Sequence, residues 1–301
     1  MTDKILITGG SGVVGKKLSR LLSENGYEVV HLSRKSNGLE EFTTFEWDIG
    51  GGVIDEKAFD GINHIVHLAG AGVADEKWTK GRKKVILDSR VESTKLLFEY
   101  AKKLDVKLDS YISASAIGIY PYSESEVSDE SSEESNTFLA EVVKKWEESA
   151  DLFSELTQVA KIRIGVVLSE EGGALKEIAK PIRFFVGAPL GHGNQYMSWI
   201  HIQDLVEIFK YALENKLKGV YNATAPNPVT NAKLTKTIAR SLKRPLLLPN
   251  VPEFAMKLML GEMSEMILNG IKASSDKIRT AGFEFTFTEI EVAVKELFSR
   301  K

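Results

Sequence analysis

The sequence predicts an α/β fold, in which a doubly wound parallel sheet is followed by a smaller, mainly helical C-terminal domain. Short apolar runs alternate with longer stretches of helical period through the first half of the chain, which is typical of a parallel sheet covered by helices. After residue 168 this alternation is lost, and glycine, proline and aromatic residues become frequent. We therefore predict a first domain over 1–168 and a second over 169–301, with segments near 198–223 rejoining the first.

The first predicted element is a buried strand over residues 4–8, which ends in a pair of glycines. Apolar residues at helical spacing then predict a helix over 12–25, and Gly26 ends it. Five further short runs predict strands at 28–32, 43–47, 64–68, 110–113 and 160–166. Two long stretches of helical period predict helices at about 80–103 and 137–155.

Beyond these elements, short strands are predicted near 198–202 and 219–223, and prolines interrupt the helices that follow residue 231. An acidic, serine-rich segment spans 123–136. Such a run is typical of a solvated loop, and a flap over a functional site is the other interpretation. A basic helical face, formed by Lys176, Lys180 and Arg183, is either solvated or meets a substrate phosphate.

Composition excludes several kinds of function. The 301 residues carry 39 Lys and Arg against 42 Asp and Glu, a net charge of −3, so no basic excess favours binding to nucleic acid. The absence of cysteine excludes disulfides, thiolate metal sites and cysteine nucleophiles, and the five histidines show no metal-ligand spacing. No stretch reaches the ~18 apolar residues of a membrane span, and the first apolar run is too short for a signal peptide. We expect a cytoplasmic protein with no membrane partner.

A glycine-rich turn is the most informative motif. Gly9, Gly12 and Gly15 follow the first strand and open the first helix, a spacing that lets backbone approach a pyrophosphate closely. Free N–H groups and the positive end of the helix dipole then face the phosphates. Because the turn lies in the strand–turn–helix context that the motif requires, we predict a dinucleotide-binding domain rather than an accidental turn. The predicted contacts are Gly9, Ser11, Gly12, Val13, Val14 and Gly15.

The end of the second strand predicts which dinucleotide binds. A site for NAD usually has Asp or Glu there, which accepts a hydrogen bond from the ribose 2′-hydroxyl. This chain has Ser33 and Arg34 instead. With no carboxylate to repel a 2′-phosphate, Arg34 can bind it through charge-assisted hydrogen bonds while Ser33 donates another. We therefore predict NADP(H); the alternative is that Arg34 and Lys35 are merely solvated.

Two further strand ends lie at the same predicted edge of the sheet. Asp48 either hydrogen-bonds the adenine amino group or forms a turn. Leu68, Ala69 and Gly70 end another strand with small residues that let backbone lie along a ribose. Open α/β sheets bind ligands at the carboxyl ends of their strands, so these residues join the predicted cofactor site.

Several separated motifs resemble one family along nearly the whole chain. They are the glycine turn at 8–15, LAGAGVADEKW with DSRVEST, SASAIGIY, FLAEVVKKWEESA, GVVLSEEGGAL, PLGHGNQYMSWIHIQDL, NATAPNPVTN and GFEF. Together they resemble the extended short-chain dehydrogenases/reductases, in an atypical branch described as sugar-nucleotide epimerase-like. The resemblance implies a Rossmann-type domain, a small C-terminal substrate-side domain and bound NADP(H). It also implies that Arg90 lies near the cofactor, whereas an arginine on a long helix is more often solvated.

The resemblance further implies a catalytic pair that this chain lacks. In the wider family a tyrosine and a lysine four residues later share one helical face, where the ammonium lowers the tyrosine pKa. None of the eight tyrosines here is followed by lysine at that spacing. Alignment on Glu147 places Leu139 at the tyrosine position and Val143 at the lysine position. Ala116 occupies the position of the family's catalytic hydroxyl, so the usual proton relay is absent.

Other hydroxyls and one histidine are the remaining candidates for chemistry. Ser113, Ser115 and Tyr120 are expected beside the nicotinamide ribose. They either act there, with Tyr120 as a substitute proton donor, or hydrogen-bond backbone at the strand end. His201 is either an acid/base group near neutral pH or an anchor between the two domains. The predicted polar linings of a substrate pocket are Gln195 and Asn227.

These observations support two functions. The first is an oxidoreductase, an NADP(H)-dependent reductase or epimerase that acts on a small polar, nucleotide-linked molecule with an altered proton donor. The second is a catalytically inactive protein in which NADP(H) binding serves a sensor or a scaffold. By analogy with related folds, the helices near 80–103 and 137–155 could pair across a two-fold axis, which makes a homodimer one expectation.

Overall fold

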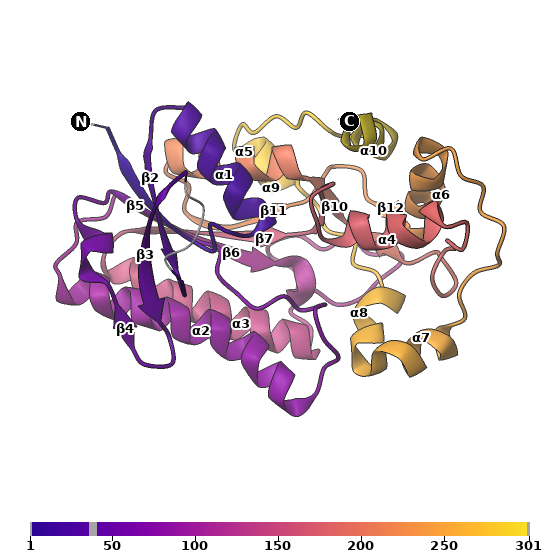
Figure 1. The fold of residues 1–301 in the computed structure, drawn as a ribbon, viewed down its shortest axis with the longest axis horizontal. Helices are drawn as coiled ribbons and strands as arrows, with labels where there is room; N and C mark the ends of the chain where they lie inside the picture. The colour runs from indigo at the N-terminus through magenta and orange to yellow at the C-terminus, as the bar shows by residue number, and fades with distance from the viewer. Residues whose placement is uncertain (1, 36–40, 300–301) are drawn as a thin grey trace.

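The computed structural model describes residues 2–35 and 41–299, and it confirms the predicted α/β fold (Figure 1). Eight strands form one sheet in the order β11-β7-β6-β5-β1-β2-β3-β4. All neighbouring pairs are parallel except β3 with β4. The strands are β1 (Lys4–Thr8), β2 (Glu28–Ser33), β3 (Thr43–Asp48), β4 (Val53–Ile54), β5 (His64–His67), β6 (Ser110–Ala116), β7 (Gln158–Ile164) and β11 (Gly219–Ala223).

The sheet reverses its winding direction beside β1. This strand pairs with β2 on one side and with β5 on the other, and Thr8 at its carboxyl end lies in register with Leu32 and His67. In open α/β sheets a crevice forms outside the strand ends at such a reversal. The turn that follows Thr8 therefore lies where folds of this kind bind ligands.

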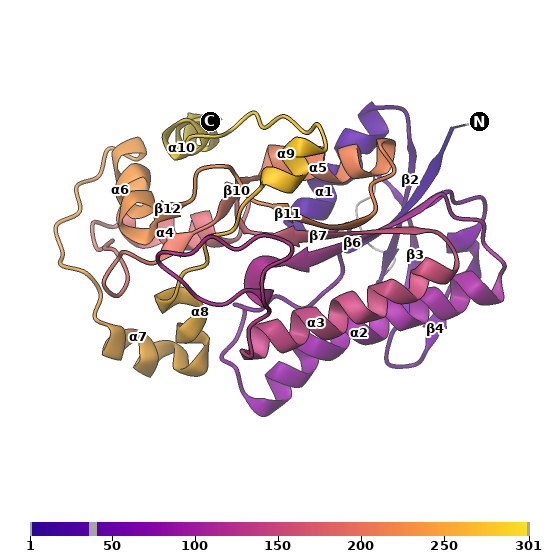
Figure 2. The same cartoon turned by 180° about the vertical axis from the view of Figure 1, so that it is seen from behind.

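Helices cover both faces of the sheet. On one face α1 (Val13–Glu24) packs against α5 (Ile202–Glu214), and on the other α2 (Lys80–Lys103) packs against α3 (Phe138–Asp151) (Figures 1 and 2). Threonine hydroxyls cap the N-termini of α2 and α3. Thr79 Oγ1 accepts from the Arg82 amide at 3.1 Å, and Thr137 Oγ1 accepts from the Ala140 amide at 3.2 Å. Each bond satisfies an amide that lacks an acceptor within its own helix.

After β7 the chain leaves the main sheet and returns to it once. At Gly165 the backbone passes so close to its neighbour that a Cβ would lie 2.3 Å from the Ser198 carbonyl oxygen. Beyond this point β8 (Val166–Leu168) pairs with β10 (Trp199–His201), and β9 (Tyr196–Met197) pairs with β12 (Val229–Thr230). Strand β11 rejoins the main sheet beside β7. The other helices are α4 (Ala174–Arg183), α6 (Asn231–Ser241), α7 (Glu253–Leu260), α8 (Ser264–Leu268), α9 (Asp276–Thr280), α10 (Ile290–Ser299) and the 3₁₀ turns η1 (Glu56–Phe59), η2 (Ile117–Ile119), η3 (Leu152–Glu155) and η4 (Gly261–Met263).

One hydrophobic core runs through both parts of the chain. Ile5 of β1 and Leu18 of α1 belong to the same buried cluster as Trp199 of β10, Ile238 of α6 and Val294 of α10. A second core lies on the other side of the sheet, beneath α2 and α3. Among the residues that the structure describes, no helix combines the length and the apolar composition needed to cross a bilayer.

The acidic segment 123–136, which we call the acidic strap, is bound to the C-terminal part of the chain. The Ser128 amide donates to the Lys272 carbonyl at 2.8 Å, and the Ser128 carbonyl accepts from the Ser274 amide at 2.8 Å. Glu130 Oε1 accepts from the Asn222 amide at 2.6 Å. Most of the strap's side chains are exposed while its backbone is paired, so it is an ordered connection rather than a free loop.

Candidate cofactor and active site

Close backbone contacts shape the glycine turn between β1 and α1. Gly9 has φ +72°, and a Cβ there would lie 2.9 Å from the Leu68 carbonyl carbon. A Cβ on Gly15 would lie 2.3 Å from the Gly9 carbonyl oxygen, so only glycine lets the helix pack on the turn. Gly12 precedes α1, and no side chain of the described residues caps that helix. Its first amides therefore have no side-chain acceptor, which is the arrangement that binds anions at helix N-termini.

Thr8 joins the ends of β1 and β5 beneath this turn. Its hydroxyl oxygen lies 3.2 Å from the amides of both Leu68 and Ala69, which donate to it, and 2.7 Å from His67 Nδ1. The other ring nitrogen of His67 lies 3.1 Å from Ser93 Oγ on α2. Burial lowers the pKa of His67 to about 3, so the ring is neutral. These bonds hold the two strand ends at a fixed separation.

The predicted contacts of the adenosine half lie along the same edge of the sheet. Ser33 is half-buried at the end of β2, and Arg34 directly after it is exposed. Asp48 is exposed at the end of β3, where a Cβ on Gly51 would lie 2.6 Å from its Oδ2. Because β1, β2 and β3 are neighbouring parallel strands, their carboxyl ends bring these residues to the same edge as the glycine turn.

Arg90 lies against the turn that follows β5. Its Nη1 donates to the Ala71 carbonyl at 3.0 Å and to the Ile86 carbonyl at 2.8 Å, and its Cζ lies 5.0 Å from the centre of the Trp146 ring. A Cβ on Gly70 would come within 3.0 Å of the same Cζ. Burial, together with the charge of Arg82, lowers the pKa of Arg90 to about 10. This guanidinium thus faces the turn after β5 and not bulk solvent.

A buried polar network occupies the ends of β6 and β7. Arg163 donates from Nε to Glu147 Oε1 at 2.8 Å and from Nη2 to Oε2 at 2.9 Å, and Ser115 Oγ donates to Oε1 at 2.5 Å. Arg163 Nη1 also donates to the Tyr120 hydroxyl at 2.9 Å, and this hydroxyl donates to Asn222 Oδ1 at 2.7 Å. The network therefore connects β6, α3, β7 and β11.

The network explains the state of two predicted catalytic residues. Tyr120 is 1% exposed, and burial raises its pKa while the neighbouring Arg163 opposes that effect. Ser115 is also buried, and its hydroxyl donates a hydrogen bond to the Glu147 carboxylate. Ser113, further back on β6, donates to the Ala114 carbonyl at 2.9 Å. The cation that a tyrosine proton donor needs is present, but all three hydroxyls are held by internal acceptors.

His201 is fully buried at the start of α5. Its Nδ1 accepts from the Gln203 amide at 3.1 Å, its Nε2 lies 3.1 Å from Glu296 Oε2, and its ring stacks on Phe287 with centres 3.8 Å apart. Glu296 belongs to α10 and Phe287 to the segment before it. The histidine thus caps one helix and connects it to another, which is the arrangement of an anchor.

The two predicted substrate residues lie in the C-terminal part. Gln195 is buried, and its Nε2 donates to the carbonyls of Leu190 and Ile267, whereas its Oε1 has no partner among the described residues. Asn227 is exposed, and its Nδ2 donates to Glu289 Oε1 at 2.6 Å. Gln195 therefore retains a buried acceptor, and Asn227 connects two surface segments.

Apolar side chains occupy the two positions, Leu139 and Val143, at which the resemblance led us to look for a catalytic tyrosine and lysine. Leu139 packs beside Gly118, just after β6, and belongs to a cluster with Trp78 and Met263. Val143 packs with Ile117, Ile119 and Tyr120 in a neighbouring cluster. Because η4 supplies Met263, the C-terminal helices pack directly over this apolar region.

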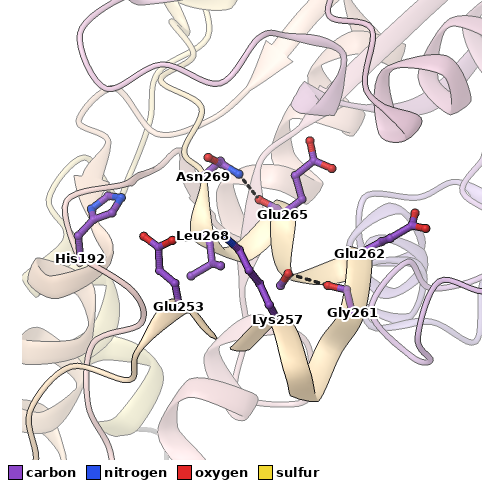
Figure 3. A pocket seen from close by; sticks show the side chains of 9 residues that line it. His192, Glu253, Lys257, Gly261, Glu262, Glu265, Leu268 and Asn269 are labelled. Carbon is purple, nitrogen blue, oxygen red and sulfur yellow. Dashed lines mark hydrogen bonds and ion pairs between the residues drawn. The ribbon is translucent and has the colours of Figure 1, made fainter. Parts of the chain in front are cut away.

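A cavity of about 540 Å³ lies between α7, α8 and the loop that carries His192 (Figure 3). Lys257 Nζ on its wall lies 3.7 Å from Glu253 Oε2, and Glu262 on the same wall pairs with Lys83 of α2. Most of its lining residues are polar or charged, and the cavity borders a contact between the two parts of the chain. Nowhere in residues 2–35 and 41–299 do His, Asp and Glu side chains form a group placed to hold a metal ion.

Comparisons with known proteins show which family the chain is related to. The sequence model of the NAD dependent epimerase/dehydratase family matches residues 5–141, and that of a domain of unknown function, DUF1731, matches residues 251–297. Epimerase family protein YfhF of Bacillus subtilis (strain 168) is 36% identical over 300 residues, which cover 98% of each chain.

Two solved structures share both sequence and fold with this chain. Human epimerase family protein SDR39U1 (isoform2), crystallised with NADPH, superimposes with a TM-score of 0.89 at 31% identity over 99% of this chain and 100% of that one. A nucleoside-diphosphate sugar epimerase from Corynebacterium glutamicum gives a TM-score of 0.79 at 31% identity, over 99% of this chain and 59% of that one. The resemblance expected from the motifs is confirmed: this chain belongs to the NAD dependent epimerase/dehydratase family.

Proposed function

We propose that this chain binds NADP(H) across the carboxyl edge of its sheet. The observation that carries the proposal is a glycine turn at the reversal beside β1 with Arg34, and no acid, at the end of β2. Human SDR39U1, crystallised with NADPH, supports the same choice of cofactor. NADP(H), when bound, supplies a hydride donor or acceptor.

Each predicted contact has a role in this proposal. Ser11, Gly12, Val13 and Val14 hold the pyrophosphate at the start of α1, while Gly9 and Gly15 keep the turn tight. Ser33 and Arg34 bind the 2′-phosphate, and Asp48 binds the adenine. Residues 68–70 lie along a ribose, with Arg90 and Ser113 toward the nicotinamide.

We further propose that the chain is a reductase or epimerase acting on a small polar, nucleotide-linked molecule. The polar cavity beside α7 and α8 and the unpartnered Oε1 of Gln195 support a polar substrate, as does the similarity to a nucleoside-diphosphate sugar epimerase. Tyr120 is the foremost proton donor, since Arg163 lies next to it, followed by Ser115 and His201. All three are buried and hydrogen-bonded within the protein, so proton transfer to a substrate requires the internal hydrogen bonds of the donor to open locally.

One observation favours the second candidate function, a catalytically inactive NADP(H)-binding sensor or scaffold. Leu139 and Val143 present hydrocarbon in place of a proton relay, and the network around Arg163 and Glu147 satisfies its own polar groups. Under this alternative the chain binds cofactor and carries out no hydride transfer.

Calorimetric titration tests the cofactor assignment. We expect Arg34→Ala to weaken NADPH binding by about ten- to a hundred-fold, since a charged hydrogen bond contributes ~1.5–3 kcal/mol, and to leave NADH binding nearly unchanged. Arg279→Ala, which removes another exposed guanidinium, is the control and should alter neither. Equal losses for both coenzymes would refute the role of Arg34.

Turnover separates the two functions. NADPH absorbance is followed with a panel of carbonyl compounds and nucleotide-linked sugars, using wild type and Tyr120→Phe. Oxidation that Tyr120→Phe reduces supports the enzyme, whereas tight NADPH binding without oxidation across the panel supports the sensor or scaffold.

A further inference from the structure

Most of the large apolar side chains that are exposed in the described residues lie in the C-terminal part. Twelve such side chains are exposed in the described residues, and eight of them fall in three short segments. The segments are 184–186, 247–248 and the outer side of α7, where Phe254 is 74% and Leu258 is 81% exposed. The other four are single valines elsewhere. We call these three segments the α7 surface.

The three segments lie at one end of the molecule. The guanidinium of Arg244 lies 4.7 Å from the centre of the Phe185 ring, which joins 184–186 to the segment that leads into α7. In both views that segment runs along the same end of the molecule as α7, remote from the N-terminus (Figures 1 and 2). The exposed apolar side chains are therefore gathered at one end of the molecule, whereas exposed apolar residues of monomeric proteins are usually scattered singly.

Backbone strain is concentrated on this surface. Phe185 has φ +63° and Lys243 has φ +54°, a region in which bulky residues are rare. Such strain persists only when the surroundings hold it, and it is often found at binding sites. Phe185 is exposed in this conformation, and the Arg244 guanidinium lies over its ring.

The surface also has its own charge. The stretch 240–259, which contains 247–248 and α7, has four exposed Lys or Arg against one Glu, in a chain whose net charge is −3. Lys257 pairs with that acid, Glu253, and the last turn of α4 adds Lys180 and Arg183 directly before 184–186. Glu262, the next acid beyond α7, is paired with Lys83 on α2. An anionic partner is therefore electrostatically favoured.

From these observations we propose that the α7 surface docks the protein on an anionic lipid bilayer. Aromatic and aliphatic side chains flanked by Lys and Arg are the pattern that inserts at a lipid headgroup layer, which requires no shape complementarity. A second copy would bring two surfaces rich in Lys and Arg together, which opposes association. The expectation of no membrane partner rested on the lack of a membrane span. Peripheral docking needs none, so the proposal departs from that expectation and is compatible with the lengths and compositions of the described helices.

Vesicle co-sedimentation of the full chain tests the proposal. We expect binding to vesicles of phosphatidylcholine mixed equally with phosphatidylglycerol, weakening as salt is raised, and little binding to phosphatidylcholine alone. No binding to the anionic vesicles, or equal binding to both kinds, would overturn the proposal.

Two matched pairs of variants locate the contact. Phe254→Ser with Leu258→Ser should abolish vesicle binding, whereas Val85→Ser with Val292→Ser, at exposed positions elsewhere, should not. Lys243→Glu with Arg244→Glu should weaken it by more than about twenty-fold, at roughly five-fold for each cation removed, and Lys102→Glu with Lys103→Glu on α2 should not. Retained NADPH binding shows that each variant is folded.

Sedimentation velocity tests whether a second copy of the chain, and not a lipid bilayer, occupies the α7 surface. A concentration-dependent dimer that Phe254→Ser with Leu258→Ser dissolves would assign the surface to a second copy and overturn the proposal. Vesicle binding that neither α7-surface variant reduces would also overturn it.

Discussion

At the scale of single residues, buried histidines support the glycine turn from below. The His31 ring lies so close to the turn that a Cβ on Gly10 would come within 2.6 Å of it, and Ser19 Oγ lies 2.7 Å from its Nε2. His67 holds Thr8 in the same way on the other side of β1. Burial lowers the pKa of His31 to about 4 and that of His67 to about 3, so both rings are uncharged while they pack against the turn.

This arrangement predicts how stability depends on pH. The folded-state pKa values lie below the unfolded value of about 6.5, so stability present above pH 6.5 is lost as the pH falls toward 4. Each histidine should contribute a slope of up to ~1.4 kcal/mol per pH unit in that range. Urea unfolding of wild type and His31→Gln at several pH values measures it; the variant should show the shallower slope. His192→Gln, at an exposed position, is the control, and an unchanged slope in His31→Gln would contradict the prediction.

The site residues that sequence reasoning missed are buried and charged. Glu147 marks the alignment of the helix, but its bidentate pairing with Arg163 joins residues 16 positions apart on different elements. Both side chains are largely buried, at 9% and 6% exposed. Arg163, placed between Ile162 and Ile164 in a buried strand, was the only signal, because charges are buried only when paired. Glu147 lies in a helix rich in charged residues and gave none.

At the scale of elements, local sequence patterns predicted where strands and helices lie better than they predicted how these elements pair. Strand 4–8 and helix 80–103 were predicted with the bounds that the structure has, since a buried run and a helical period are properties of neighbouring residues. The strand predicted over 160–166 instead ends at Ile164, because Gly165 passes against Ser198 and sends Val166–Leu168 to pair with β10. The acidic strap has no periodic pattern, so its pairing with 272–274 was not predictable.

The strap makes a testable connection between the two parts of the chain. Glu130→Ala removes the carboxylate that accepts from the Asn222 amide, a charged hydrogen bond at the partly exposed edge of β11. We expect the amides of Ser128 and Ser274 to exchange with solvent about ten-fold faster, since local opening then costs less. Hydrogen exchange measures this. Glu133→Ala, exposed on the same strap, should leave their exchange unchanged, and equal effects of the two variants would refute the connection.

At the scale of the whole molecule, the two predicted domains share one core. Trp199, Ile238 and Val294 from the C-terminal part are buried in the same cluster as Ile5 and Leu18. Neither part can separate without exposing this apolar surface to water, which is strongly unfavourable. Residue 168 therefore marks the point where the chain leaves the main sheet. That it also separates two folding units stays a prediction.

A shared core predicts a single unfolding transition. Differential scanning calorimetry of the full chain should show one peak, and NADPH at about a hundred-fold excess over its Kd should shift it as a whole by ~2.7 kcal/mol of added stability. NADH at the same concentration should shift it less. Two peaks, of which NADPH moves only one, would show that the parts unfold independently.

The sequence by itself determined most of the individual strands and helices, the glycine turn and the lack of a Tyr–Lys pair, because each depends on residues near one another in the chain. Only the tertiary structure decided that Tyr120 lies beside Arg163, that the strap is paired and that the exposed apolar side chains gather at one end. Hydropathy detects long apolar runs and not exposure, so a surface built from three short segments could not be recognised before the fold assembled it.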